Sequence, residues 1–143
     1  YDLVGISIRR TGLQKFIGTA LLSGYVAMML TGIFMISFRQ QVLAYDATLH
    51  TFFLGFVFSM IFAHGPVILP GVLGISAKPW HKMLYLWLFL LHGSWATRVL
   101  ADILLDFELR KISGWVTAVA ITGYFISMGI LTMRSHFRHA KVL

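Results

Sequence analysis

The chain contains one stretch of 23 residues without a charged side chain, Phe16 to Phe38, which reads FIGTALLSGYVAMMLTGIFMISF. A helix needs about 20 predominantly apolar residues to cross the hydrocarbon core of a bilayer. A secretory signal peptide has a shorter apolar core and a small-residue cleavage site, and this stretch shows neither feature clearly. The stretch therefore predicts a membrane-spanning helix.

Three further stretches are also predominantly apolar and about long enough to cross a bilayer. The second predicted span covers 47–70, the third covers 80–101 and the fourth covers 115–133. Because the connections between them are short, consecutive helices are expected to be antiparallel neighbours. The sequence thus predicts an all-α integral membrane protein, a four-helix bundle with up-down-up-down topology, formed by residues 1–143 as a single domain.

The composition agrees with this fold class. Of the 143 residues, 58% are hydrophobic and 12% are charged, and the mean hydropathy is +0.81. A soluble domain has roughly 45–50% apolar and about 25% charged residues, so a soluble enzyme and a disordered tail are excluded. The chain has no cysteine, which excludes disulfides, thiolate metal sites and iron–sulfur clusters.

The net charge of +7 is interpreted mainly as a topology signal, because Lys and Arg are enriched on the cytoplasmic side of membrane proteins. Eight Lys and Arg residues lie on the side of the two termini and the second connection: Arg9, Arg10, Lys15, Lys78, Lys82, Arg134, Arg138 and Lys141. Three lie on the other side, with most of the acidic residues: Arg39, Arg110 and Lys111. Both termini are therefore predicted to be cytoplasmic, in a bacterial-type inner (cytoplasmic) membrane. The expected partner is membrane lipid and not nucleic acid.

Small residues mark the expected packing faces of the helices. Glycine, alanine and serine let helices approach closely in lipid. The first span places Ala20, Gly24 and Gly32 near one stripe, and the fourth span places Gly123 and Ser127 four residues apart. These residues predict helix contacts and no chemistry.

The informative polar feature is a group of four histidines on the second and third spans, His50, His64, His81 and His92. Ionisable residues within a span are costly and by default indicate a function. On straight α-helices, His50 and His64 would lie within roughly 40° of one face and about 21 Å apart, and His81 and His92 within roughly 20° and about 16 Å apart. Each helix of this hairpin is therefore expected to present two imidazoles on one side.

Imidazoles that face each other between helices suit haem b, because a six-coordinate iron takes one neutral imidazole from each side. The separation of 14 residues on the second span resembles the spacing in di-haem cytochromes b, so one or two haems are expected. His50 and His92 could share an outer haem, and His64 could pair with His81 or with His92. The pairing stays open because two prolines of the second span can kink it or end it early.

Arg98 is the one charged residue well inside a predicted span. It lies near the level of His50 and could pair with haem propionates or with Asp102, one helical turn further on. The imidazoles of His50, His64 and His92 could instead hold copper or another metal ion.

The segment from His50 to Gly71, HTFFLGFVFSMIFAHGPVILPG, resembles the haem-ligand helix of haem-copper oxidases and nitric oxide reductases. It begins with a histidine, continues through an aromatic and glycine-rich run and ends near a proline. It is also similar to segments of the NnrS-type haem/copper membrane proteins. The oxidase resemblance implies that His50 is an axial ligand of a low-spin haem. The copper-ligand motifs of the oxidases are not recognisable in this chain, so oxygen reduction by this chain alone is not implied.

The leading functional hypothesis is a haem b-binding membrane subunit that transfers electrons, or responds to a diatomic gas, within a larger complex of membrane subunits. Quinone is a candidate exchange partner beside such a haem, although no motif specifies it. The chain shows no carboxylate pair, nucleophile–base arrangement or phosphate-binding loop, which favours a non-catalytic subunit over an enzyme. The alternative is a cofactor-free accessory subunit that stabilises a larger respiratory or photosynthetic complex.

Overall fold

The computed structural model describes residues 11–37, 44–75 and 79–140, without the side chains of 44, 136 and 138–140. The helices, in chain order, are α2 (Leu13–Ser37), α3 (Ala44–His50), the π-helix η1 (Thr51–Val57), α4 (Phe58–Val72), α5 (Met83–Leu104) and α6 (Phe107–Ala140). Several residues used to predict the spans and their orientation lie outside this part of the chain: Arg9, Arg10, Phe38, Arg39, Lys78 and Lys141.

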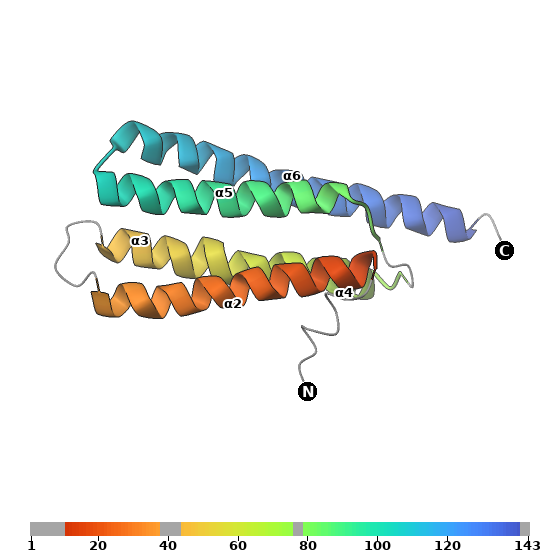
Figure 1. Cartoon of the computed structure of the whole chain (residues 1–143). Helices are drawn as coiled ribbons and strands as arrows, with labels where there is room; N and C mark the ends of the chain where they lie inside the picture. The colour runs from red at the N-terminus through yellow and green to blue at the C-terminus, as the bar shows by residue number, and fades with distance from the viewer. Residues whose placement is uncertain (1–10, 38–43, 76–78, 141–143) are drawn as a thin grey trace.

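The all-helical architecture with four helical rods is confirmed, since α3, η1 and α4 follow one another directly as a single rod (Figure 1). Consecutive rods run in opposite directions, as expected (Figure 1). Within the described part of the chain, three helices are long and apolar enough to cross a membrane: Leu13–Ser37, Tyr45–Val72 and Phe107–Ser135. The helix of the third predicted span, α5, is not among these three. Its Arg98 and Asp102 lower its hydropathy, because charged side chains are the least favourable residues in a membrane helix.

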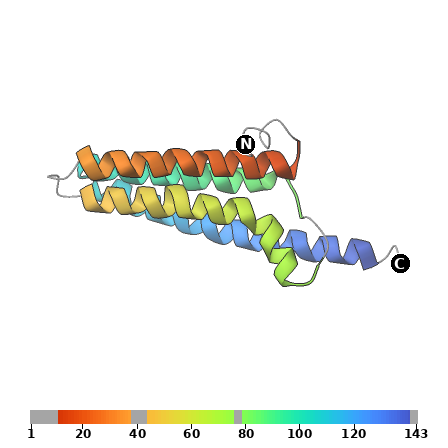
Figure 2. The same ribbon diagram turned by 90° about the horizontal axis from the view of Figure 1, so that it is seen from below.

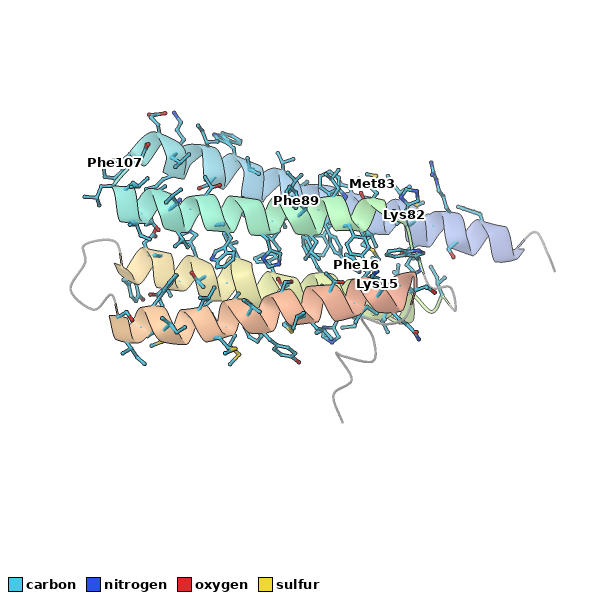
Figure 3. All side chains as sticks on the ribbon, viewed as in Figure 1. Lys15, Phe16, Lys82, Met83, Phe89 and Phe107 are labelled. Carbon is cyan, nitrogen blue, oxygen red and sulfur yellow. The ribbon has the colours of Figure 1, made fainter. Side chains whose placement is uncertain are left out.

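The four rods pack as two hairpins, one formed by α2 with η1 and α4, the other by α5 with α6 (Figure 1). Apolar side chains fill the space between the hairpins (Figure 3). Near the start of α2, the Phe16 ring packs edge-on against Tyr85, with ring centroids 5.2 Å apart. It also packs against Trp80 in a tilted arrangement, with centroids 6.0 Å apart. Phe62 and Tyr124 are fully buried in the same core.

Small residues form the packing faces at several of the expected positions. A Cβ on Gly24 would collide with Met60 of α4, and one on Gly123 would collide with the Trp87 ring of α5. Both glycines therefore permit a close helix contact, as expected. Gly32 does not belong to this face, because it is exposed and an added Cβ would meet nothing within 4 Å.

The second rod contains a seven-residue π-helix between two α-helical parts. At its end the Phe58 N–H donates to the Phe53 carbonyl, five residues back, where an α-helix would use the carbonyl four residues back. The prolines do not end the rod early: Pro66 and Pro70 lie inside α4, which continues to Val72. Figure 2 shows α4 turning away from the line of α3, consistent with the expected kink.

Candidate functional site

Four charged side chains form an ion-pair network at the end of the bundle where α5 turns into α6. Asp46 of α3 accepts hydrogen bonds on Oδ2 from Arg98 Nη2 and from Arg110 Nη2, each at 2.9 Å. Asp102 of α5 lies 3.0 Å from Arg110 Nε and 3.6 Å from Arg98 Nε, measured to Oδ1. The Asp102 side chain is 1% exposed. Two carboxylates thus face two guanidinium groups, and their formal charges cancel.

The turn between α5 and α6 positions Arg110 for this network. Leu105 ends α5 in the left-handed conformation, with φ at 56°. The Asp106 carboxylate then accepts a hydrogen bond from the Leu109 N–H at 3.0 Å, which is the N-cap arrangement that starts a helix. The tight turn brings the first turn of α6 beside the end of α5. Arg110 consequently reaches Asp102 and, across the bundle, Asp46.

His50 lies next to the network, and a hydrogen bond orients its ring. Its Nδ1 is 2.8 Å from the Asp46 backbone carbonyl. A carbonyl can only accept, so Nδ1 carries the proton and Nε2 of the neutral ring presents a lone pair. Ligand-type atoms of Asp46, His50 and Asp102 lie within 4.8 Å of one another. The two guanidinium groups already balance the carboxylates, so this group has no excess negative charge to offer a divalent cation.

A cavity of about 140 Å³ adjoins this network and is partly open to the surface. It is lined by residues of η1, α5 and α6 as well as the histidine: His50, Leu54, Arg98, Ser113, Gly114 and Thr117. Sites for drug-sized ligands and cofactors occupy roughly 300–1,000 Å³. The cavity therefore suits a ligand much smaller than haem.

His64 lies on α4 and is exposed. Its Nδ1 is 2.7 Å from the Met60 backbone carbonyl, so this ring nitrogen also carries the proton and Nε2 presents a lone pair. The neighbouring apolar residues Ile61, Val67 and Ile68 are exposed as well. His64 is thus an oriented imidazole on an apolar outer surface of the bundle.

His92 is engaged inside the bundle. Its Nε2 lies 3.0 Å from Ser59 Oγ, and Ser59 Oγ donates its own proton to the Gly55 carbonyl at 2.6 Å. The Nε2 of His92 is therefore the donor in this pair. In this tautomer Nε2 has no lone pair with which to bind a metal ion. His81 is exposed, and its Nδ1 accepts a hydrogen bond from the Met83 N–H at 3.1 Å, at the start of α5.

Among the described residues, no group of three or more potential metal ligands contains more than one of the four candidate histidines. His92 contacts Ser59, which lies nine residues beyond His50 along the second rod, a separation on the order of 10 Å. His50 and His64 were expected on one face of the second rod, but they lie on different faces. His50 borders the cavity between the hairpins, whereas His64 is exposed. The physical reason is the π-helix between them: each π turn contains more residues than an α turn, so the face of every later residue shifts.

Arg98 follows one of its two expected alternatives, the ion pair with Asp102. Sequence reasoning missed the contributions of Asp46 and Arg110, which it used only as topology signals. Asp46 is 52 residues from Arg98 and 64 from Arg110. One feature of the sequence could have predicted these ion pairs: acidic and basic residues lie at the same end of three antiparallel spans.

A family model described as a domain of unknown function, DUF8744, matches residues 1–133. The chain belongs to this family. No curated protein and no solved structure matches it. The DUF8744 match extends through all four rods as far as residue 133 of α6, and therefore includes the ion-pair network, the cavity and His64.

Proposed function

We propose that this chain is a haem b-binding subunit of a larger membrane assembly, in which it takes part in transmembrane electron transfer. The observation that carries this proposal is the geometry of His64, an exposed imidazole whose Nδ1 is hydrogen-bonded to the Met60 carbonyl at 2.7 Å. The proposed location is a bacterial-type inner membrane, with both termini in the cytoplasm.

Metal-ligating histidines almost always donate their second ring N–H to a carbonyl, a carboxylate or water, which fixes the tautomer and the ring orientation. His64 has this arrangement. A polar ring on an apolar membrane-facing surface is costly unless it has a partner. Ligation of a haem iron would provide that partner, and bound haem supplies one-electron transfer.

In this proposal the second axial ligand comes from outside the four helices. His50 borders a cavity of about 140 Å³, which is too small for haem. His92 donates its Nε2–H to Ser59, and His81 holds the start of α5. His64 is the remaining candidate, and it faces outward, where another membrane subunit would complete the coordination.

The test is the optical spectrum of the full chain, expressed with ample haem supply and purified in detergent. We expect a reducible Soret band with high-spin features, because His64 provides a single axial ligand. Added imidazole should convert the spectrum to a low-spin form. His64→Ala should abolish haem binding, and His81→Ala, which alters another exposed histidine, should leave it unchanged.

Three results would contradict the proposal. They are the absence of any haem signal in folded wild-type protein, an unchanged signal in His64→Ala, and a low-spin spectrum without added imidazole. The last result would mean that both axial ligands come from this chain. Metal analysis of the same samples tests whether copper is bound instead, by the imidazoles of His50, His64 and His92.

A cofactor-free accessory subunit is the second candidate function. It is favoured by the hydrogen bonds that already join the helices, such as Trp87 Nε1 to Ser127 Oγ at 2.9 Å and Trp95 Nε1 to Thr51 Oγ1 at 3.0 Å. A bundle held in this way needs no cofactor to fold. In this case His64→Ala would change the size of the native membrane complex on gels, and the purified chain would show no haem signal.

A further inference from the structure

The cavity beside His50 is lined by both polar and apolar residues. His50, Ser113 and Thr117 contribute polar groups, and Leu54 contributes an apolar side chain. At about 140 Å³, its volume is close to that of an engineered protein cavity of about 150 Å³ that binds benzene. By volume, the cavity is comparable to the space that one six-membered ring requires.

The hydrogen bonds around the cavity show that it offers mainly acceptors. Ser113 Oγ donates its proton to the Arg110 carbonyl at 2.7 Å. The Thr117 hydroxyl proton is directed at Ser94 Oγ or at the Ser113 carbonyl, both at 2.9 Å. The Nδ1–H of His50 is directed at the Asp46 carbonyl, so its Nε2 is an acceptor. The two hydroxyl oxygens and this nitrogen can therefore accept hydrogen bonds from a ligand.

The strongest donor at the cavity is already in use. Arg98 donates through Nε and Nη2 to Asp46, and through Nη1 to the Arg110 carbonyl. An anion would consequently find few available donors. A cation would lie beside two guanidinium groups, those of Arg98 and Arg110. A neutral ligand that donates hydrogen bonds satisfies the cavity best.

We propose that this cavity binds the headgroup of a hydroquinone, the reduced form of a membrane quinone, through its hydroxyl groups. The aromatic ring matches the volume, and the hydroxyl protons match the acceptors of His50, Ser113 and Thr117. The partial opening of the cavity leaves a path for an isoprenoid tail. The proposal goes beyond haem binding at His64 and does not depend on it, because the cavity lies at a different place in the bundle.

Binding is tested by calorimetric titration of the full chain in detergent micelles under anaerobic conditions and without a reductant, so that neither the hydroquinone nor the oxidised quinone changes its oxidation state. The ligand is a hydroquinone with a short alkyl tail. One control is its dimethyl ether, which has the same ring and tail but no hydroxyl protons, and the other is the oxidised quinone. We expect saturable hydroquinone binding and at least tenfold weaker binding of both controls, since about 1.4 kcal/mol corresponds to a factor of ten and unmatched buried acceptors cost this much.

Two variants locate the binding site. Gly114→Leu adds a bulky side chain at a residue that lines the cavity, and an added Cβ at this position meets nothing within 4 Å, so the fold should tolerate it. We expect at least tenfold weaker binding. Gly129→Leu is the matched control, because Gly129 lies on the same helix, has the same open surroundings and is about 22 Å further along. It should bind like the wild type.

The proposal is overturned if folded wild-type protein shows no saturable binding, or if the dimethyl ether binds as tightly as the hydroquinone. It is also overturned if Gly114→Leu and Gly129→Leu bind equally. These readouts are calorimetric, whereas the haem proposal is tested by optical spectra of His64 variants. If one of the two proposals fails its test, the test of the other proposal is unaffected.

Discussion

The hydroxyl of Tyr124 on α6 donates a 2.7 Å hydrogen bond to the backbone carbonyl of Phe62 on α4. Phe62 precedes Pro66 by four residues, and proline has no N–H to donate to this carbonyl. Tyr124 thus replaces the helix hydrogen bond that Pro66 removes. The two rings also stack, with centroids 3.8 Å apart and planes at 8°. Across the bundle, α6 therefore stabilises the interrupted part of α4.

Replacing Tyr124 by phenylalanine should destabilise the protein by about 1–3 kcal/mol, because a buried carbonyl loses its donor while the stacked ring is kept. The cost should be smaller in a Pro66→Ala background, where the alanine N–H can donate to the Phe62 carbonyl. A double-mutant cycle of unfolding free energies in mixed micelles measures this coupling. Equal costs of Tyr124→Phe in both backgrounds would show that Pro66 and Tyr124 are independent.

Gly65→Ala should destabilise α4, because the added Cβ would lie 2.5 Å from the Tyr124 hydroxyl oxygen. We expect a loss of about 1–3 kcal/mol, the usual cost of overpacking. Gly71→Ala is the control on the same helix, where the added Cβ meets nothing within 4 Å. It should be neutral or should stabilise by up to about 1 kcal/mol through helix propensity. Thermal unfolding of the two variants in detergent distinguishes these outcomes.

Asp102→Asn should be strongly destabilising. It removes one of two carboxylates that balance Arg98 and Arg110, and the Asp102 side chain is 1% exposed. We expect about 2–4 kcal/mol, slightly below the value for a fully buried pair because the guanidinium groups are partly exposed. Asp106→Asn keeps an N-cap residue of similar strength and should cost about 0.5 kcal/mol. Similar unfolding free energies for the two variants would refute the network as a source of stability.

Thr51→Val should cost about 1–3 kcal/mol, since Trp95 Nε1 loses its hydrogen-bond acceptor at the junction of α3 and η1. Thr19→Val is the control, because the Thr19 hydroxyl donates to a carbonyl of its own helix, that of Lys15, and Thr19 is only half-buried. The control should change stability by less than about 0.5 kcal/mol. Tryptophan fluorescence and chemical unfolding report on both variants. If Thr19→Val lowered the free energy of unfolding by as much as Thr51→Val does, the effect would come from the valine substitution itself and not from the lost hydrogen bond of Trp95.

Much of the fold follows from local properties of the sequence. Long, predominantly apolar stretches indicated the positions of the helices, because helix length and apolarity decide whether a segment can span a bilayer. Gly24 and Gly123 indicated packing faces for the same local reason. The prediction of Gly32 as part of such a face was wrong, since a small residue permits a close contact without creating one.

The candidate site was less predictable. The four histidines could be recognised as unusual, and the pairing of Arg98 with Asp102 followed from helical spacing. The directions of His50 and His64 could not be obtained, because the prediction assumed a regular α-helix and η1 changes the number of residues per turn. Each nitrogen's role also depends on a hydrogen-bond partner that only the folded chain provides.

By itself the sequence determined four antiparallel apolar helices and the presence of a few ionisable residues among them. Tertiary structure alone decided that Asp46 and Arg110 join Arg98 and Asp102, that His50 borders a cavity, and that His64 faces outward. The physical reason is the range of the interactions. Helix formation and membrane affinity depend on neighbouring residues, whereas ion pairs and cavities depend on where distant segments meet.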